Sequence, residues 1–275
     1  MGGTDHQSGT DHQTGAEAVQ RLVDEHGGAL YSIARRLCGN PHEAEDLVQE
    51  VFLRAHKSWE GFRGESSERA WLYRIAANAC QRMHRPRLGE PERIGSLDEL
   101  LPWGEPRIAA IASEQEDASQ LRIRAEGRER LESEIARLPD SFRVPLVLKE
   151  IAGLSSAEIA GILGLEDGTV RSRVHRARLK LRAAVDRVLP RRAGDAPPPA
   201  YDERTCLDLL EAKQAALDRG ERFESEVVCE RCRSVFASLD LTQEVCRELA
   251  AGGMPEGLRE RLRGRLGGEP GAASG

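Results

Sequence analysis

The stretch Gly168 to Arg182, GTVRSRVHRARLKLR, constrains the fold of this chain more than any other part of the sequence. Its apolar residues recur at helical spacing and form one stripe, made of Val170, Val174, Ala177 and Leu181. The residues off this stripe are polar or basic: Arg171, Ser172, His175, Arg176 and Arg178. The pattern predicts an amphipathic helix that packs through one face and points a basic face outward.

A short helix is predicted immediately upstream. Ser155 to Glu158, SSAE, has the pattern of a capping box, and Ile159, Ala160 and Ile162 would face inward. Gly164 to Gly168 separates this helix from the basic one. A helix, a tight turn with glycine and a basic helix together indicate a helix-turn-helix.

Duplex DNA is the partner that this pair of helices predicts. Arginine can bind guanine edges or phosphates, and the hydroxyls of Thr169 and Ser172 can reach phosphates or bases. The alternative is an ordinary solvated basic face. The formal net charge of −6 excludes a uniformly basic nucleic-acid coat, so DNA contact must depend on local segregation of charge.

Other classes of protein are excluded by what the sequence lacks. It contains no run of about 18 apolar residues, so no membrane partner is expected. The N-terminal MGGTDHQSGTDHQTG is polar and has no signal-peptide core, which indicates a cytoplasmic protein. No glycine-rich phosphate loop, catalytic-triad spacing or HExxH motif appears, so we expect no enzymatic activity.

The N-terminal part of the chain predicts a helical bundle. Residues 1–15 contain the near-repeat GTDHQSGTDHQTG and are expected to be a disordered tail. Helical periodicity begins at Ala16 and stops at Gly39, after which Asn40 and Pro41 are placed to begin a second helix. A later segment brings aromatic, amide and basic side chains onto one helix: Trp71, Tyr73, Arg74, Asn78, Gln81 and Arg82. Stacking on single-stranded bases requires such a mixture; the alternative is a helix whose aromatic residues only fill the core.

Two runs of the sequence resemble the two characteristic domains of an extracytoplasmic-function (ECF) sigma factor of bacterial RNA polymerase. The first is NPHEAEDLVQEVFLRAHKSWEGFRGESSERAWLYRIAANACQRMHR, and the second is LPDSFRVPLVLKEIAGLSSAEIAGILGLEDGTVRSRVHRARLKLR. The resemblance covers roughly residues 16–188. It implies an all-α fold with a region 2 bundle at 16–86, a linker at 87–125 and a region 4 helix-turn-helix at 126–188.

The same resemblance implies two partners, the RNA polymerase core, through its clamp helices and flap, and promoter DNA. The positions that match the polymerase-docking segment are Asp46, Leu47, Gln49, Glu50 and Phe52. Asn78 matches the position that receives a flipped base of the −10 element, on a helix that also carries Trp71, Tyr73 and Arg74. The positions that match the helix that reads the −35 element are Arg171, Ser172, Arg173 and Arg176, and Thr169 is a further candidate DNA contact on the same helix.

The composition changes after Val188, which marks a further domain. Residues 189–200 contain consecutive prolines and predict a stiff linker. Residues 201–275 hold four of the six cysteines and predict a small helical Cys-rich domain. These four are Cys206, Cys229, Cys232 and Cys246. In a reducing compartment such clustering favours metal ligation or redox chemistry over structural disulfides.

A metal site at these four cysteines would prefer a soft ion, so zinc, cadmium or cuprous copper is the expected cofactor. Cys229 and Cys232 form a CxxC pair, and a turn is predicted at Ser238 to Thr242, before Cys246. If the helix were unbroken instead, Cys246 would lie about 21 Å from Cys232, too far to share an ion. Cys38 and Cys80 are expected to be buried small hydrophobes.

This C-terminal part resembles the zinc-binding anti-sigma domain, with a cysteine on a first helix, CxxC opening the second, and a closing amphipathic helix at Pro255 to Leu266. Ser225 stands where that family has a histidine, which favours an all-thiolate or Cys/Glu site. Sigma factors with a Cys-rich extension resemble the CorE-like group, whose members sense metal ions through it.

The hypothesis from the sequence is therefore a metal-responsive sigma factor with its own fused regulator, in which metal binding activates. A separate anti-sigma factor would be a further partner. Two alternatives remain. One is a redox-regulated sigma factor that uses the same cysteines as a thiol/disulfide switch. The other is a stand-alone DNA-binding regulator that uses only the helix-turn-helix.

Overall fold

The structure is a computed structural model and describes residues 15–83, 94–95, 97–101, 103, 109, 118–187, 189–190 and 197–267. Every element within these ranges is a helix, which confirms the predicted all-α fold. The predicted tail at residues 1–15 lies outside the described residues except for Gly15, as does much of the predicted linkers. No described helix combines the length and the apolar character needed to cross a membrane.

The N-terminal bundle consists of α1 (Gly15–Cys38), α2 (Pro41–Ser58), the 3-10 helix η1 (Trp59–Gly61) and α3 (Glu68–Met83). The helix start predicted at Asn40 is confirmed, because its side chain accepts the N–H of Glu43 at 2.8 Å and Pro41 occupies the first helical position. The apolar faces of the helices meet in a hydrophobic core, in which Cys38 and Cys80 are buried as predicted.

The second unit contains α4 (Leu97–Leu100), α5 (Ala118–Arg137), α6 (Asp140–Glu150), α7 (Ser156–Leu163) and α8 (Asp167–Asp186). The predicted capping box is present: Glu158 N–H donates to Ser155 Oγ, and Ser155 N–H donates to Glu158 Oε2. Gly164 ends α7 with φ 66°, a left-handed conformation that glycine adopts without strain. Helices α7 and α8 therefore form the predicted helix-turn-helix.

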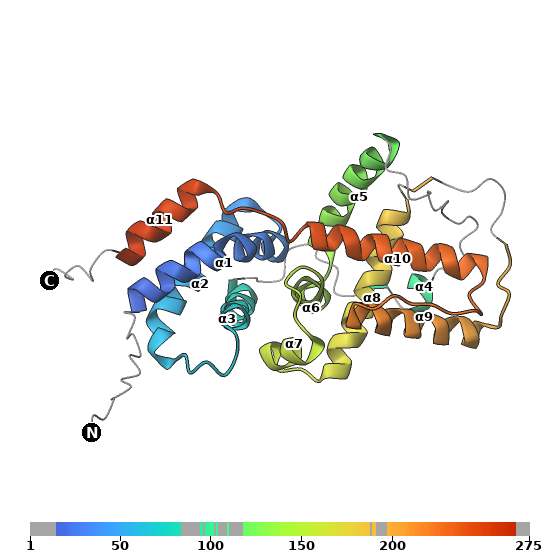
Figure 1. Cartoon of the computed structure of the whole chain (residues 1–275), viewed down its shortest axis with the longest axis horizontal. Helices are drawn as coiled ribbons and strands as arrows, with labels where there is room; N and C mark the ends of the chain where they lie inside the picture. Colours follow the sequence, from blue (N-terminus) through green and yellow to red (C-terminus); the bar gives the residue numbers. More distant parts are fainter. Residues whose placement is uncertain are drawn as a thin grey trace, which may run out of the picture.

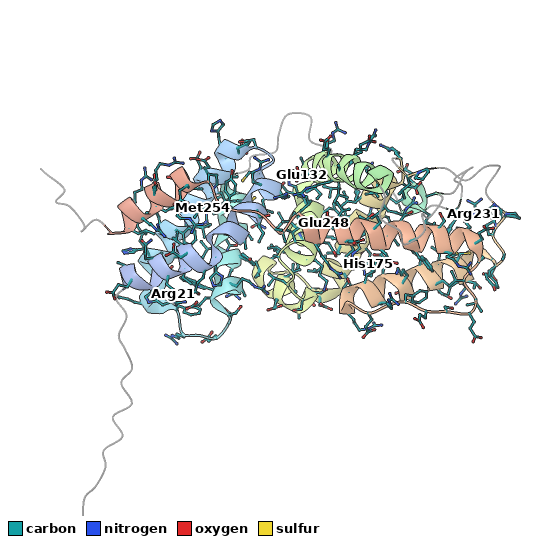
Figure 2. All side chains as sticks on the ribbon, turned by 45° about the horizontal axis from the view of Figure 1, so that its top comes forward. Arg21, Glu132, His175, Arg231, Glu248 and Met254 are labelled. Atoms are coloured by element: carbon teal, nitrogen blue, oxygen red, sulfur yellow. The ribbon has the colours of Figure 1, made fainter. Side chains whose placement is uncertain are left out.

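The C-terminal part contains α9 (Glu203–Arg219), α10 (Glu230–Glu248) and α11 (Glu256–Gly267). Figure 1 shows α9 and α10 beside α8 at one end of the molecule and α11 beside α1 and α2 at the other. Figure 2 shows Arg231 and Glu248 at the two ends of α10. This single helix therefore runs from one end of the molecule toward the N-terminal bundle.

The predicted turn at Ser238 to Thr242 is wrong, because α10 is continuous there. Both hydroxyls are satisfied inside the helix: Ser238 Oγ donates to Ser234 O at 2.9 Å, and Thr242 Oγ1 donates to Ser238 O at 2.6 Å. Ser and Thr in a helix can bond back to the carbonyl four residues earlier in this way. Both side chains are buried, so packing kept polar residues in the helix where the sequence favoured a turn.

Candidate nucleic-acid interface

A basic hollow surrounds Asn78 on α3. Its volume is 320 Å³, and the residues that line it are Arg54, Lys57, Ser58, Ile75, Asn78 and Arg82. Cations from α2 and α3 thus border an amide that can both donate and accept hydrogen bonds. A single base with its phosphate would find hydrogen-bonding groups, an apolar side chain and positive charge there. The sequence pointed to Asn78 and Arg82, but Arg54 and Lys57 come from the preceding helix and were missed.

The other residues predicted on α3 occupy different environments. Trp71 is half-buried and packs against Phe62 and Trp59, with ring centroids 5.0 Å and 6.0 Å away. Arg74 is exposed. Tyr73 is only 2 % exposed, and burial raises the pKa of its hydroxyl. Tyr73 lies on the same helical face as the buried core residue Ala77, and its contact with DNA stays a prediction.

The predicted DNA-reading residues of α8 cluster on its N-terminal half. Arg171 and Ser172 are exposed, and Thr169 and Arg173 are half-buried. Arg171 is held beside Asp167, one turn earlier, at 2.6 Å. The exposed positions carry the donors that major-groove recognition uses.

Arg176, also predicted to read DNA, is engaged within the protein. Its guanidinium donates to the carbonyl of Gly95 at 2.8 Å and lies 5.2 Å from the centre of the Phe142 ring. Residues of α8 and α9, together with Leu101, line an open hollow of 570 Å³ beside the N-terminal half of α8. Leu210 and Gln214 of α9 line the hollow opposite Ser172. A major groove is about 12 Å wide and accepts a helix only where no other element covers its DNA-facing side. In this structure α9 partly covers that side of α8.

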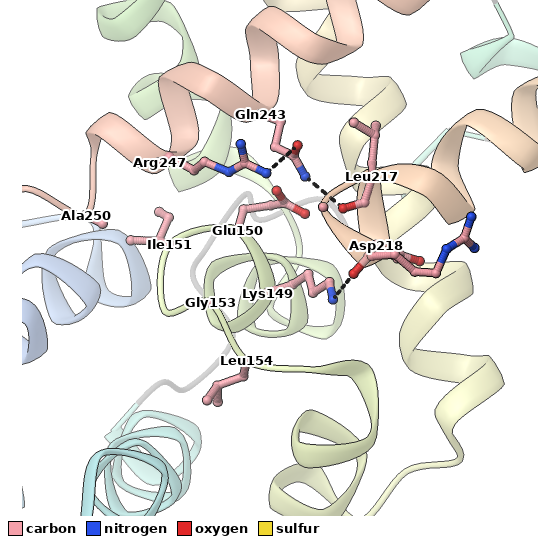
Figure 3. A pocket seen from close by; sticks show the side chains of 12 residues that line it. Lys149, Glu150, Ile151, Gly153, Leu154, Leu217, Asp218, Gln243, Arg247 and Ala250 are labelled. Carbon is pink, nitrogen blue, oxygen red and sulfur yellow. Dashed lines mark hydrogen bonds between the residues drawn. The ribbon is translucent and has the colours of Figure 1, made fainter. Parts of the chain in front are cut away.

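Arg178 does not point outward as the sequence predicted. It is buried, with Nη2 2.5 Å from Glu150 Oε1 and Nη1 2.8 Å from Asp218 Oδ1. Burial lowers the pKa of a guanidinium, but Glu150 and Asp218 outweigh this and raise the pKa of Arg178. Figure 3 shows Glu150 and Asp218 in the hollow between α6, α9 and α10. The prediction failed because Asp218 lies far along the sequence in a different helix.

The predicted polymerase-docking residues on α2 divide into two groups. Asp46 is exposed, and Gln49 and Glu50 are half-buried. Leu47 and Phe52 are 0 % exposed, and their contact with the polymerase stays a prediction. They belong to the apolar stripe of α2 that fills the core.

Three of the C-terminal cysteines gather where α9 and α10 begin. Cys206 lies in the first turn of α9, Cys229 is the N-cap of α10, and Cys232 follows in the first turn of α10. Burial raises the pKa of Cys206 and of Cys232. Burial also opposes ionisation of Cys229, but the backbone N–H groups of Cys232, Ala200 and Arg231 that face its sulfur lower its pKa overall. Cys229 is therefore the thiol that ionises most easily among the three.

The predicted four-cysteine metal set is not present as such. Because α10 is continuous, Cys246 lies about 21 Å from Cys232 along the helix axis and cannot share an ion with it. Cys206 and Cys229 flank Cys232 closely enough to influence its pKa, although the three sulfur atoms do not all lie within 4.8 Å of one another. Three soft ligands are thus brought together at one end of the molecule, and a metal ion would need them to move closer.

One group with tighter ligand spacing was not predicted. The ligand atoms of Glu25, His26 and Glu68 all lie within 4.8 Å of one another among the described residues. Arg21 already binds this group, with Nη2 2.6 Å from Glu68 Oε1 and Nη1 3.1 Å from Glu25 Oε2. The hydrogen bond from Arg21 lowers the pKa of Glu68. The guanidinium fills the place of a cation, so this is an ion-pair cluster that ties α1 to α3.

Comparisons with known proteins match both halves of this interface. Residues 22–87 match the family model Sigma-70 region 2, and residues 128–181 match Sigma-70, region 4. The chain is 40% identical over 163 residues to the ECF RNA polymerase sigma factor SigE of Mycolicibacterium smegmatis, covering 58% of this chain and 59% of that protein. It is 34% identical over 171 residues to the ECF RNA polymerase sigma factor SigW of Bacillus subtilis, covering 60% of this chain and 88% of that protein.

A solved structure, titled "Structure of CnrH in complex with the cytosolic domain of CnrY", is similar at 29% identity with a TM-score of 0.43. The similarity extends over 62% of this chain and 88% of the matched chain.

Proposed function

This chain belongs to the ECF RNA polymerase sigma factors, and we propose from its two nucleic-acid surfaces that it directs bacterial RNA polymerase to promoters and helps to open them. The basic hollow at Asn78 would receive an unpaired base of the −10 element. The N-terminal half of α8 would read the −35 element as duplex in the major groove. The polymerase would supply catalysis, and this chain would supply recognition.

The observation that carries the proposal is the hollow at Asn78, because it differs in kind from the surface of α8. A helix with exposed arginine suits duplex DNA, whereas a concave site with an amide and several cations suits an extruded base. A stand-alone regulator that uses only the helix-turn-helix would need no such hollow. Polymerase contact is proposed for the exposed or half-exposed residues Asp46, Gln49 and Glu50.

The test is run-off transcription with bacterial core polymerase from duplex templates that carry the region upstream of this gene. We expect transcripts that depend on this protein and start at one position. Binding to duplex DNA without any effect on polymerase would contradict the proposal and favour the stand-alone regulator.

We further propose that Cys206, Cys229 and Cys232 regulate this activity by holding a soft metal ion. Zinc, cadmium or cuprous copper fits a three-thiol set, and such an ion would fix the start of α9 against the start of α10. The lowered pKa of Cys229 favours the thiolate that ligation needs. Titration of these metals in the transcription assay, under reducing conditions, tests this part: the transcript should rise with one of them.

A redox switch at the same cysteines is favoured by one specific observation. Cys229 is the half-exposed N-cap of a helix, and the buried Cys232 follows in the first turn. An oxidant such as hydrogen peroxide would take two electrons and two protons from this pair as the disulfide forms. A transcript that responds to peroxide in a metal-free protein, and not to metals, would select this alternative.

A further inference from the structure

Helix α11 lies against α1 and α2 of the N-terminal bundle, with its leucines facing inward. Leu258 and Leu262 are 0 % exposed, and Leu266 is 4 % exposed. These residues recur every four positions and form one stripe. Apart from them the helix is almost entirely polar and basic, so its one apolar face is the face that is buried against the region 2 bundle.

Ionic contacts set the position of α11 on this surface. Arg261 Nη2 lies 2.5 Å from Glu45 Oε2, and Arg265 Nη1 donates to Gln49 Oε1 at 3.0 Å. On the α1 side, Arg263 Nη2 lies 2.7 Å from Asp24 Oδ1. Exposed ion pairs are individually weak, so the leucines supply most of the affinity and the arginines supply the register. Glu45 and Gln49 lie one turn apart and mark one ridge of α2.

The segment that joins α10 to α11 fits closely onto α1. Ser32 Oγ donates to the carbonyl of Leu249 at 2.5 Å, in a buried contact. A Cβ atom at Gly28 would lie 3.1 Å from the carbonyl oxygen of Gly252, and one at Gly27 would lie 2.8 Å from Met254 Cε. Figure 2 shows Met254, a residue of this segment, beside the N-terminal bundle. Two successive glycines inside a helix weaken it, and here they make room for the segment.

From this fit we infer that α11 is a built-in competitor of RNA polymerase: in the free protein it occupies one ridge of α2, and the polymerase must displace it. The inference rests on the proposed function, since it takes the acidic face of α2 as the polymerase-docking surface. Beyond the proposed function, the inference names α11 as the segment that blocks this surface, and it names the residues that hold α11 there.

The geometry shows why the two occupants would exclude each other. Asp46 and Glu50 follow Glu45 and Gln49 directly in the sequence and mark the neighbouring ridge of the same helix. A helix with its side chains is about 10 Å wide, which is more than the spacing of adjacent ridges. A partner that contacts Asp46 and Glu50 therefore meets α11 unless α11 moves away. Gln49, a proposed polymerase contact, is already bonded to Arg265.

The experiment measures the affinity of fluorescently labelled full-length protein for bacterial core polymerase. Leu262→Asp places a charge in the buried apolar contact between α11 and the N-terminal bundle. Arg261→Glu replaces the ion pair with Glu45 by a repulsion between two carboxylates. Arg222→Glu is the matched control. It makes the same change of charge as Arg261→Glu, and Arg222 is exposed in the loop between α9 and α10. Hydrogen exchange of α11 in each variant reports whether the helix is released, independently of polymerase.

We expect Leu262→Asp to bind core polymerase about tenfold more tightly and Arg261→Glu several-fold more tightly, because removal of a competing state raises the competent fraction. Arg222→Glu should bind as the wild type does. If α11 is released in both variants and core binding stays unchanged or weakens, the inference is overturned while the proposed function stands. If neither the wild type nor any variant binds core polymerase, the proposed function itself fails.

Discussion

Asp218 near the end of α9 lies 2.8 Å from Nε2 of His175 on α8, the second helix of the helix-turn-helix. The same carboxylate contacts Arg178, through its other oxygen, also at 2.8 Å. One side chain of the C-terminal part therefore holds two basic residues of α8. The relationship makes α9 a structural partner of α8, and it can be disrupted by a single substitution.

Asp218→Asn should lower the free energy of unfolding by about 1–3 kcal/mol, because it removes the charge that the buried Arg178 faces. Glu150 still pairs with Arg178, so the loss is smaller than that of an isolated buried charge. Urea denaturation followed by circular dichroism measures the change. Asp208→Asn is the control on the same helix, because Asp208 is exposed. Equal stability of the two variants would contradict the assigned role of Asp218.

The contribution of Asp218 should depend on pH in the acid range. Burial raises its pKa, but the hydrogen bond from His175 and the charge of Arg178 outweigh burial, so its pKa in the folded protein is lowered. A carboxylate with a lowered pKa stabilises above its unfolded value of about 3.9, and this stability is lost as the pH falls through the folded value. The difference between wild type and Asp218→Asn should thus shrink as the pH falls below about 4. A difference that vanishes near neutral pH would contradict this assignment.

Local sequence rules located most helix starts and the helix-turn-helix. The capping box at Ser155 and the cap at Asn40 act within a few residues, so the sequence contains all of the interaction. The turn predicted near Ser238 failed because buried hydroxyls bonded back along α10, which depends on packing that the sequence does not display.

The candidate sites depended more on contacts between distant segments. Tyr73 and Arg178 were assigned to the surface by type, but the core and the C-terminal helices bury them. Asn78 came from the family resemblance, and the cations of α2 that surround it became visible only once the two helices were packed. The sequence of α11 did not indicate where this helix docks, because Glu45 lies 216 positions before its partner Arg261.

Asn78→Ala should reduce promoter opening, because the hollow would lose the amide that can hydrogen-bond an extruded base. Capture of an unstacked base is worth about 1–3 kcal/mol, which predicts a loss of open complex of roughly 5- to 150-fold. Permanganate reactivity of thymines in the −10 region measures the open complex. Gln81→Ala is the control on the same helix, because Gln81 is exposed and does not line the hollow. Core polymerase affinity should not change, and a normal open complex in Asn78→Ala would exclude the proposed base capture.

Cys229→Ser and Cys246→Ser should distinguish a cysteine of the proposed metal site from a cysteine that only fills the hydrophobic core. Cys229 belongs to the three-thiol group, so Cys229→Ser should abolish the cadmium–thiolate absorbance and any metal response, with core polymerase binding retained. Cys246 is 1 % exposed at the other end of α10, so Cys246→Ser should keep the same cadmium affinity. It should instead lower the free energy of unfolding by about 1–3 kcal/mol, because a hydroxyl replaces a buried thiol. Loss of cadmium binding in Cys246→Ser would restore the four-cysteine site and require α10 to bend; full binding in Cys229→Ser would remove metal regulation from this end of the molecule.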